Sequence, residues 1–320
     1  MKIGIDAMGG DFAPAEAVKG AYLAQLAHPE WKLVLFGKAA EIEAVCTAEN
    51  LQSPGWEVVD CPQIVEMSEH PVRALASKPD SSIMTGFRHL AEGRIDAWLS
   101  AGNTGAMLVG SLQSVKAVEG ILRPCLTSVL PRMNNNPGLL LDVGANADCK
   151  PEHIQQFAVL GSLFYSAVYG VSSPKVGLLN LGEEEEKGSI LTRAAHGLLK
   201  NTAGIRFEGN VEGRDIFSDA FDVVVCDGFT GNVIIKVCEG MYYRLAKRGI
   251  QDEYLDKFNF KHYGGSAILG VNAPVIVGHG ISKADTFVKM IEMAAAQVQN
   301  KLVEKIRESL AGFGSTHATA

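Results

Sequence analysis

The sequence lacks the features that mark membrane-spanning, secreted and nucleic-acid-binding proteins. No uninterrupted apolar run approaches the roughly 18 residues that a membrane-spanning helix needs. The N-terminal segment MKIGIDAMGGD enters a strand-like pattern at once, without the apolar core of a signal peptide. Basic residues are not in excess, because the formal net charge is -7, and phosphate backbones are bound by clustered Lys and Arg. We therefore expect a cytoplasmic protein that does not bind nucleic acid and at most touches the inner face of the membrane.

Motifs for disulfides, metals, nucleotides and activated nucleophiles are also missing. The six cysteines form no C-x-x-C pair and have no metal-type His spacing, which is typical of reduced thiols. No G-x-G-x-x-G follows the first apolar run, and the 182–189 segment transposes the Lys and Gly of a Walker loop. No G-x-S-x-G elbow occurs. We expect no metal, no cofactor and no catalytic triad, and we interpret Cys226 as strand core.

Short apolar runs separated by helix-length stretches dominate the chain. This alternation predicts an α/β protein with a mostly parallel sheet covered by helices on both faces, a three-layer α/β/α sandwich. The runs that we interpret as strands are Lys2–Asp6, Leu33–Phe36, Ile95–Ser100, Leu139–Val143, Val176–Leu181, Val223–Cys226 and Val275–Val277.

The sequence offers no linker that would divide it, so we predict a single domain over residues 1–312 and a frayed tail over 313–320. A long final helix is expected from Asp285 to Gly312. Residues 241–262 mix aromatic and basic residues and predict a protruding helical arm. That arm is either a solvated connection or dimer contact, or a docking surface for an acidic carrier protein or a membrane, through Arg244, Lys247, Arg248, Lys257 and Lys261.

Glycine, Asn and Thr recur where the predicted strands end. In a parallel sheet these ends share one edge, and glycine lets the backbone approach an anion closely. The six loops concerned are 6–11, 100–105, 142–146, 180–189, 227–232 and 278–280. Each one alone is consistent with an ordinary connection, but together they favour a shared anion site.

Two cations stand out near these loops. Lys187 follows four glutamates in an otherwise acidic turn, where it is placed to hold phosphate or to neutralise an oxyanion, or else is a solvated surface lysine. Arg73 lies in HPVRALASKPDSSI, a basic and hydroxyl-rich stretch that either closes over an anion or forms a surface loop.

Several long strings in the chain are unusual in combination. They are IDAMGGD, PVRA with SSI, SAGNTGA, LLLDVGAN, KPEH, VGLLNLG, GNVEGRD, DGFTGNV and YGG with APVI. At these strings the sequence closely resembles the phosphate acyltransferase family (acyl-acyl-carrier-protein:phosphate acyltransferase, PlsX-type). The resemblance covers nearly the whole chain, although the 241–262 arm looks shorter than the hairpin of some longer members.

The resemblance implies a fold similar to the isopropylmalate dehydrogenase and phosphotransacetylase group and a homodimer. It implies transfer of a long-chain fatty acyl group from acyl carrier protein to inorganic phosphate, giving acyl phosphate for phospholipid synthesis. A membrane glycerol-3-phosphate acyltransferase would then consume the product. A phosphotransacetylase-like enzyme that uses acyl-coenzyme A and a non-catalytic scaffold for lipid enzymes are the alternatives.

At these motifs and in the 180–189 loop we expect Lys187, Asn232 and Asp227 to be catalytic. Lys187 and Arg73 would bind phosphate, Asn232 and Asn103 would donate to the carbonyl oxyanion, and Asp227 or Asp6 would orient the donors. The residues expected to bind substrate are Asp6, Gly9, Gly10, Asp11, Arg73, Ser81, Asn103, Thr104, Asp142, Asn146, Asn180, Glu212, Thr230 and Gly231.

Overall fold

The chain forms two compact units. The computed structural model describes residues 1–52, 55–133, 136–259 and 263–311. Unit 1 comprises Met1–Ala117 and Lys261–Gln299, and unit 2 comprises Val118–Phe260 and Asn300–Ala320. The single domain over residues 1–312 stays a prediction, and the frayed tail over 313–320 lies outside the described residues.

Unit 1 is built on a mostly parallel sheet. In spatial order its strands are β3 (Glu57–Asp60), β2 (Lys32–Gly37), β1 (Lys2–Asp6), β4 (Ala97–Ser100), β11 (Val275–Val277) and β10 (Ser266–Leu269). Only the β10 and β11 pairing is antiparallel among these strands. Residues 3–6 of β1 are all buried, on both faces of the strand, as expected for a strand covered by helices on both sides.

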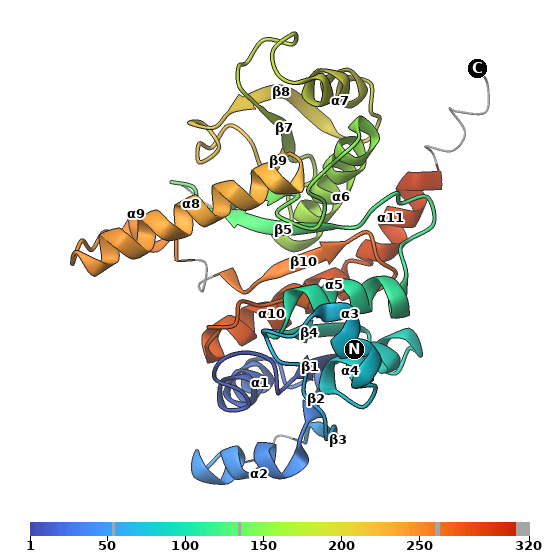
Figure 1. Cartoon of the computed structure of the whole chain (residues 1–320), viewed down its shortest axis with the longest axis vertical. Helices are drawn as coiled ribbons and strands as arrows, with labels where there is room; N and C mark the ends of the chain where they lie inside the picture. Colours follow the sequence, from blue (N-terminus) through green and yellow to red (C-terminus); the bar gives the residue numbers. More distant parts are fainter. Residues whose placement is uncertain (53–54, 134–135, 260–262, 312–320) are drawn as a thin grey trace. The chain divides into compact units, whose positions relative to one another are not determined.

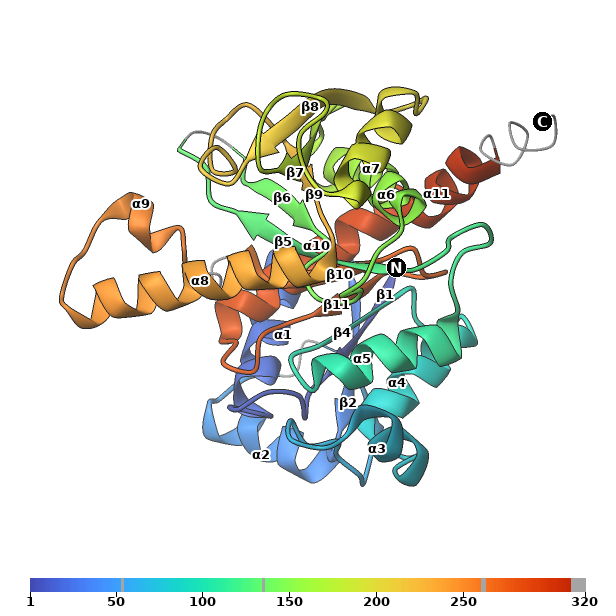
Figure 2. The ribbon, with the colours of Figure 1, turned by 45° about the horizontal axis from the view of Figure 1, so that its top comes forward.

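Helices cover both faces of this sheet. On one side lie α1 (Ala15–Ala27), α10 (Ala284–Gln299) and α2 (Ala39–Ala48), and on the other lie α3 (Pro71–Ser77), α4 (Ser82–Ala91) and α5 (Thr104–Gly110) with the π-helical turn η1 (Ser111–Val115) (Figure 1, Figure 2). Close packing depends on glycine: a Cβ on Gly86 of α4 would collide with the Trp98 ring of β4.

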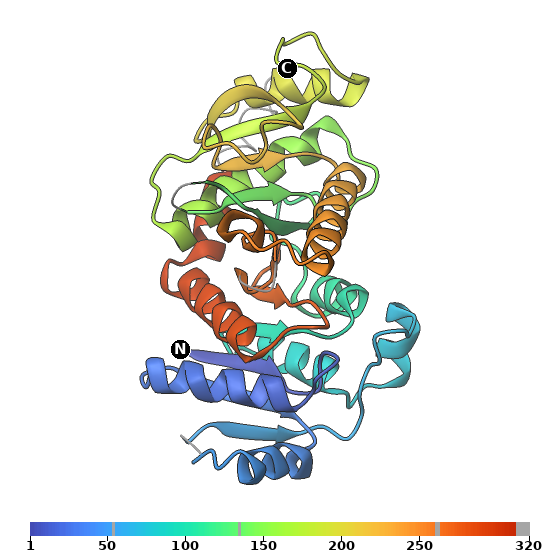
Figure 3. The same ribbon diagram turned by 90° about the vertical axis from the view of Figure 1, so that its left-hand side faces the viewer.

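Unit 2 repeats the plan with a second sheet. Its strand order is β5 (Cys125–Leu130), β6 (Gly138–Leu141), β9 (Val223–Val225), β7 (Lys175–Asn180) and β8 (Arg206–Glu212). Only the β5 and β6 pairing is antiparallel among them. Helix α6 (Pro151–Tyr169) packs on β6, β7 and β9, while α8 (Gly228–Lys247) contacts β5 and β6 from the opposite face (Figure 3). Helices α7 (Ile190–Lys200) and α11 (Leu302–Ala311) lie beside α6.

The α/β fold with a mostly parallel sheet and helices on both faces is confirmed. All seven predicted strands are present within a residue or two of their expected bounds. The sequence reading missed β3, β5, β8 and β10.

The prediction of one long final helix was wrong. The segment breaks at Lys301, which has a φ of 51°, a left-handed value that ends a helix, and α10 and α11 belong to different units. The expected end at Gly312 lies outside the described residues.

The expected arm is helical in its described part. Its first residues are the end of α8, and the short helix α9 (Glu253–Asp256) follows after a turn (Figure 2). Lys257 donates from Nζ to the backbone oxygens of Arg132 and Met133 at 3.0 Å, so this cation links the arm to the 132–133 segment. Lys261 lies outside the described residues. No helix in the described ranges combines the length and the apolar character that crossing a bilayer requires.

Candidate active site

Two glycine-rich loops of unit 2 interlock where β6 and β9 end. The 142–146 loop follows β6, and the 227–232 segment opens α8. A Cβ on Gly231 would collide with the backbone oxygen of Asp142, and one on Gly228 would lie 2.6 Å from the Asp142 carboxylate. The DVGAN and DGFTGN strings therefore encode a close approach between a strand end and a helix N-terminus.

Asp142 is the centre of this contact. Its fully buried carboxylate accepts from Leu126 N at 2.9 Å and Ala145 N at 3.2 Å through Oδ1. Its Oδ2 accepts from the Asn146 backbone N at 2.6 Å and the Asn146 side-chain Nδ2 at 2.9 Å. Burial raises the pKa of Asp142, and these hydrogen bonds oppose the rise. Asp142 and Asn146 thus shape the loop from inside it.

The start of α8 presents the residues that the sequence assigns to catalysis. Asp227 caps the helix by accepting from the Thr230 backbone N at 2.9 Å and from Thr230 Oγ1 at 2.7 Å. Asn232 is exposed, and its Nδ2 lies 3.4 Å from the Val143 oxygen, at the limit of a hydrogen bond. Asn232 keeps donor capacity at the surface, and Asp227 holds the first turn of α8. The catalytic roles expected for both residues stay predictions.

The end of β7 carries the turn with Lys187. Asn180 donates from Nδ2 to the Lys187 oxygen at 3.1 Å and accepts from Leu181 N at 2.9 Å. Gly188 has a φ of 102°, and a Cβ there would collide with Asn180 Oδ1. These constraints fix the turn while the Lys187 side chain stays exposed. Glu212 at the end of β8 pairs instead with Arg214, at 3.0 Å.

A pocket opens in unit 2 at the ends of β7, β8 and β9. Its volume is about 490 Å³. The described residues that line it are Ile154, Leu178, Leu179, Asn180, Leu181, Ser189, Leu191, Thr192, Gly213, Cys226, Asp227, Thr230 and Ile234. Burial raises the pKa of Cys226 well above that of a free thiol, the reverse of an activated nucleophile.

Unit 1 has its own buried carboxylate, where β1 and β4 end. Asp6 accepts from Ser100 Oγ at 2.6 Å and from Met8 N at 3.0 Å. Burial raises its pKa, which the hydrogen bonds from Ser100 and Ser82 oppose. A Cβ on Gly9 would lie 2.6 Å from Ser100 Oγ, so IDAMGGD and SAGNTGA interlock as the two loops of unit 2 do.

The rest of this loop cluster joins the 278–280 turn. Asp11 donates from its backbone N to the Gly280 oxygen at 2.7 Å, and Gly10 has a φ of 105°, open to glycine alone without strain. Thr104 is exposed at the first turn of α5.

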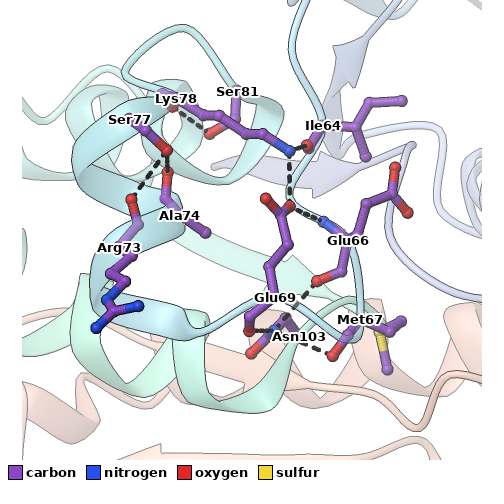
Figure 4. A network of polar contacts seen from close by, with 10 residues as sticks. All are labelled: Ile64, Glu66, Met67, Glu69, Arg73, Ala74, Ser77, Lys78, Ser81 and Asn103. Atoms are coloured by element: carbon purple, nitrogen blue, oxygen red, sulfur yellow. Dashed lines mark hydrogen bonds and ion pairs between the residues drawn. The ribbon is translucent and has the colours of Figure 1, made fainter.

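Asn103 serves the structure of unit 1. Its Nδ2 donates to the backbone oxygens of Glu66, Met67 and Glu69 at 2.9 to 3.2 Å, and its Oδ1 caps α5 through Ala106 N at 3.0 Å (Figure 4). These bonds occupy both N–H groups, which leaves none for an oxyanion. Asn103 thus positions the 66–69 loop, and its expected role as an oxyanion donor stays a prediction.

The basic and hydroxyl-rich stretch divides into two parts. Lys78 pairs with Glu69 at 2.6 Å, and Ser81 is buried with its Oγ donating to the Lys78 oxygen at 2.8 Å (Figure 4). Arg73 is exposed on α3, and its side chain points away from this network (Figure 4). Of these residues, Arg73 keeps its charge available for an anion.

The expected loops are thus gathered into two sets. Loops 6–11, 100–105 and 278–280 meet in unit 1, and loops 142–146, 180–189 and 227–232 lie together in unit 2. A single crevice shared by all six stays a prediction. Ser100 lies in the expected 100–105 loop, but its hydrogen bond to Asp6 was not expected, and Thr192, which donates to Asn180, lies outside the six loops.

The fold resembles those of solved acyl-transfer enzymes. A phosphotransacetylase from Streptococcus pyogenes superposes with a TM-score of 0.69 at 17% identity, covering 93% of this chain and 94% of the other. A branched-chain phosphotransacylase from Enterococcus faecalis gives a TM-score of 0.60 at 15% identity, covering 93% and 99%. The expected phosphotransacetylase-like fold is confirmed.

Sequence comparison gives the family. Residues 1–252 match a family model described as "Fatty acid synthesis protein". A "Phosphate acyltransferase" from Dictyoglomus turgidum is 38% identical, covering 97% of this chain and 98% of the relative. One from Pelotomaculum thermopropionicum is 41% identical, covering 97% and 95%. The resemblance seen in the motifs is confirmed, and the chain belongs to the phosphate acyltransferase family.

Proposed function

We propose that this protein transfers a long-chain fatty acyl group from acyl carrier protein to inorganic phosphate, giving acyl phosphate for phospholipid synthesis. The observation that carries the proposal is the near full-length match to relatives named phosphate acyltransferase. The exposed Lys187, on a turn fixed by Asn180 and Gly188, supports it by offering a cation at a strand end.

The reaction suits a site without a strong base. A phosphate oxygen attacks the thioester carbonyl carbon, the carbon–oxygen bond forms, and the carbon–sulfur bond breaks. The carrier thiolate leaves and takes a proton from water. Phosphate is already an anion near neutral pH, and a thiol with a pKa of about 8.5 is a good leaving group. Catalysis then rests on positioning and on stabilising the oxyanion.

We assign phosphate binding to Lys187 and Arg73, and donation to the carbonyl oxyanion to Asn232. Lys187 and Arg73 are exposed, and neither has an ion-pair partner among the described residues. Asp227 positions the first turn of α8 and so the backbone of Asn232. In unit 1, Asp6 holds the glycine loop that follows β1.

The proposed partners are acyl carrier protein, a second copy of the chain and a glycerol-3-phosphate acyltransferase that consumes the product. The exposed Arg244, Lys247 and Arg248 at the end of α8 support docking of an acidic carrier or peripheral contact with an anionic membrane. The phosphotransacetylase neighbours keep acyl-coenzyme A as the competing donor. A non-catalytic scaffold would bind acyl carrier protein without turning it over.

Lys187→Met tests the assignment directly. The change removes the cation and keeps most of the length of the side chain, so we expect the KM for phosphate to rise or kcat to fall by about tenfold or more. Hydroxylamine trapping of acyl phosphate, with palmitoyl carrier protein as donor, measures the rate. Lys289→Met on α10 is the matched control, because that lysine is also exposed and pairs only with Glu292 among the described residues.

The possible results separate the alternatives. Wild-type kinetics for phosphate in the Lys187→Met enzyme would show that Lys187 does not bind phosphate. Faster turnover of palmitoyl-coenzyme A than of palmitoyl carrier protein by the wild-type enzyme would favour the coenzyme A alternative. Binding of palmitoyl carrier protein without any turnover would favour the scaffold.

A further inference from the structure

The pocket of unit 2 has the character of a hydrocarbon site. Its volume of about 490 Å³ lies within the range of about 300 to 1,000 Å³ that is usual for ligand pockets. If each methylene takes about 30 Å³, close to the share of a water molecule, the pocket holds a chain of more than ten methylene groups. Leu178, Leu179, Leu191, Ile154 and Ile234 supply most of its apolar wall.

The polar groups of the wall are already bonded to one another. Thr192 Oγ1 donates to Asn180 Oδ1 at 3.3 Å, and Ser189 Oγ accepts from Thr192 N at 3.1 Å. Both oxygens of Asp227 accept from Thr230. None of the described lining residues is Lys, Arg or His. The wall thus offers a carboxylate and no cation, which disfavours phosphate, while its satisfied polar groups tolerate a hydrocarbon chain.

The rim joins this apolar wall to the proposed cation. Leu181 lines the pocket with 71% of its surface exposed, so an apolar occupant would bury it. The next residue, Gly182, has its Cβ position 3.0 Å from Lys187 Cγ, which places the Lys187 side chain over the same turn. A thioester carbonyl near Lys187 would therefore sit at the mouth of an apolar cavity.

We propose that this pocket holds the acyl chain of the substrate and sets its length, an inference that rests on the proposed acyl transfer. The chain enters past Leu181 and runs between α7 and the first turns of α8, with the thioester left at the rim. Phosphate binds outside the pocket, on the side of Lys187.

Gly213 provides a clean way to narrow the pocket. It lines the cavity, has no left-handed φ, and a Cβ there meets no atom within 4 Å. Gly213→Phe is expected to lower the ratio of kcat/KM for palmitoyl over butyryl carrier protein by about tenfold or more, since each methylene excluded from an apolar pocket counts strongly. Gly197→Phe on α7 is the matched control: its Cβ position is equally open, and it does not line the pocket.

Leu191→Trp is the second variant, and it fills the pocket from α7. Far-UV circular dichroism verifies that each variant is folded. The proposal is supported if Gly213→Phe or Leu191→Trp shifts the palmitoyl to butyryl ratio and Gly197→Phe does not. It is overturned if both folded pocket variants keep the wild-type ratio. Absence of phosphate-dependent product from the wild-type enzyme with every acyl carrier protein would instead refute the proposed function.

Discussion

The substitution Asp142→Asn is expected to lower the unfolding free energy of unit 2 and to leave that of unit 1 unchanged. The substitution keeps the shape of the side chain but replaces one acceptor oxygen with an amide N–H₂ group. Four N–H groups of Leu126, Ala145 and Asn146 now point at the two carboxylate oxygens, at 2.6 to 3.2 Å. Whichever way the new amide turns, two buried donors lose their acceptor.

The cost follows from these donors. A buried donor left without a partner costs about 1 to 3 kcal/mol, so two of them cost about 2 to 6 kcal/mol. Burial raises the pKa of Asp142, which shows that the ionised carboxylate is itself disfavoured at this position. The amide removes that charge, and this offsets part of the cost of the two unpaired donors. We expect unit 2 to lose about 2 to 4 kcal/mol of unfolding free energy.

Urea denaturation followed by two signals measures the effect. All three tryptophans, Trp31, Trp56 and Trp98, belong to unit 1, so tryptophan fluorescence reports that unit, whereas far-UV circular dichroism reports both. Asp142→Asn should shift the part of the dichroism transition that comes from unit 2 to lower urea concentration, and this part does not contribute to the tryptophan fluorescence signal. An unchanged dichroism transition, or an equal shift in both signals, would refute the reasoning.

Asp6→Asn is the matched control in unit 1. Its side-chain partners are the hydroxyls of Ser100, at 2.6 Å, and of Ser82, and a hydroxyl can rotate and accept from the new amide. We expect a loss of less than about 1 kcal/mol, seen in tryptophan fluorescence. A control as damaging as Asp142→Asn would show that the number of N–H donors does not set the cost.

Two further stability predictions concern the same unit. The pKa of His153 is lowered, first by burial, so its contribution to stability is present above its unfolded pKa and is lost as the pH falls below that value. The variant His153→Gln keeps an acceptor for Lys150 N. In urea titrations it should lose less stability than the wild type between about pH 7.5 and pH 5.5. Gly231→Ala should lower the unfolding free energy by about 1 to 3 kcal/mol, because its Cβ collides with the Asp142 oxygen, whereas Gly240→Ala on the same helix, in open space, should raise it by about 0.5 to 1 kcal/mol. Equal stability of the two alanine variants would contradict the proposed close contact.

The sequence predicted most of the buried strands and missed the exposed strands β3 and β8, but it also missed β5, whose six residues are all buried. Strands such as β1 and β7 are covered on both faces and read as continuous apolar runs. The β3 and β8 strands lie at the two sheet edges, where polar and exposed residues break that pattern. The break at Lys301 was hidden because the apolar spacing continues across it, while its backbone dihedral follows from the tertiary packing.

The interlocked loops were more predictable than the hydrogen bonds that their side chains make. Glycines at strand ends pointed to the interlocked loops, because close backbone approach leaves a trace in residue type. The commitment of Asn103 to three backbone oxygens and of Asp227 to Thr230 depends on neighbours brought in by the fold. The order of residues along the chain does not show which side-chain amide, that of Asn103 or that of Asn232, keeps an N–H group available for a ligand.

The central claim is acyl transfer to phosphate, and phosphorus NMR of the purified protein with palmitoyl carrier protein and inorganic phosphate tests it most directly. The account predicts an acyl phosphate resonance that grows in step with the free carrier thiol and disappears when phosphate is omitted. Thiol release without that resonance, or no release at all, would contradict it.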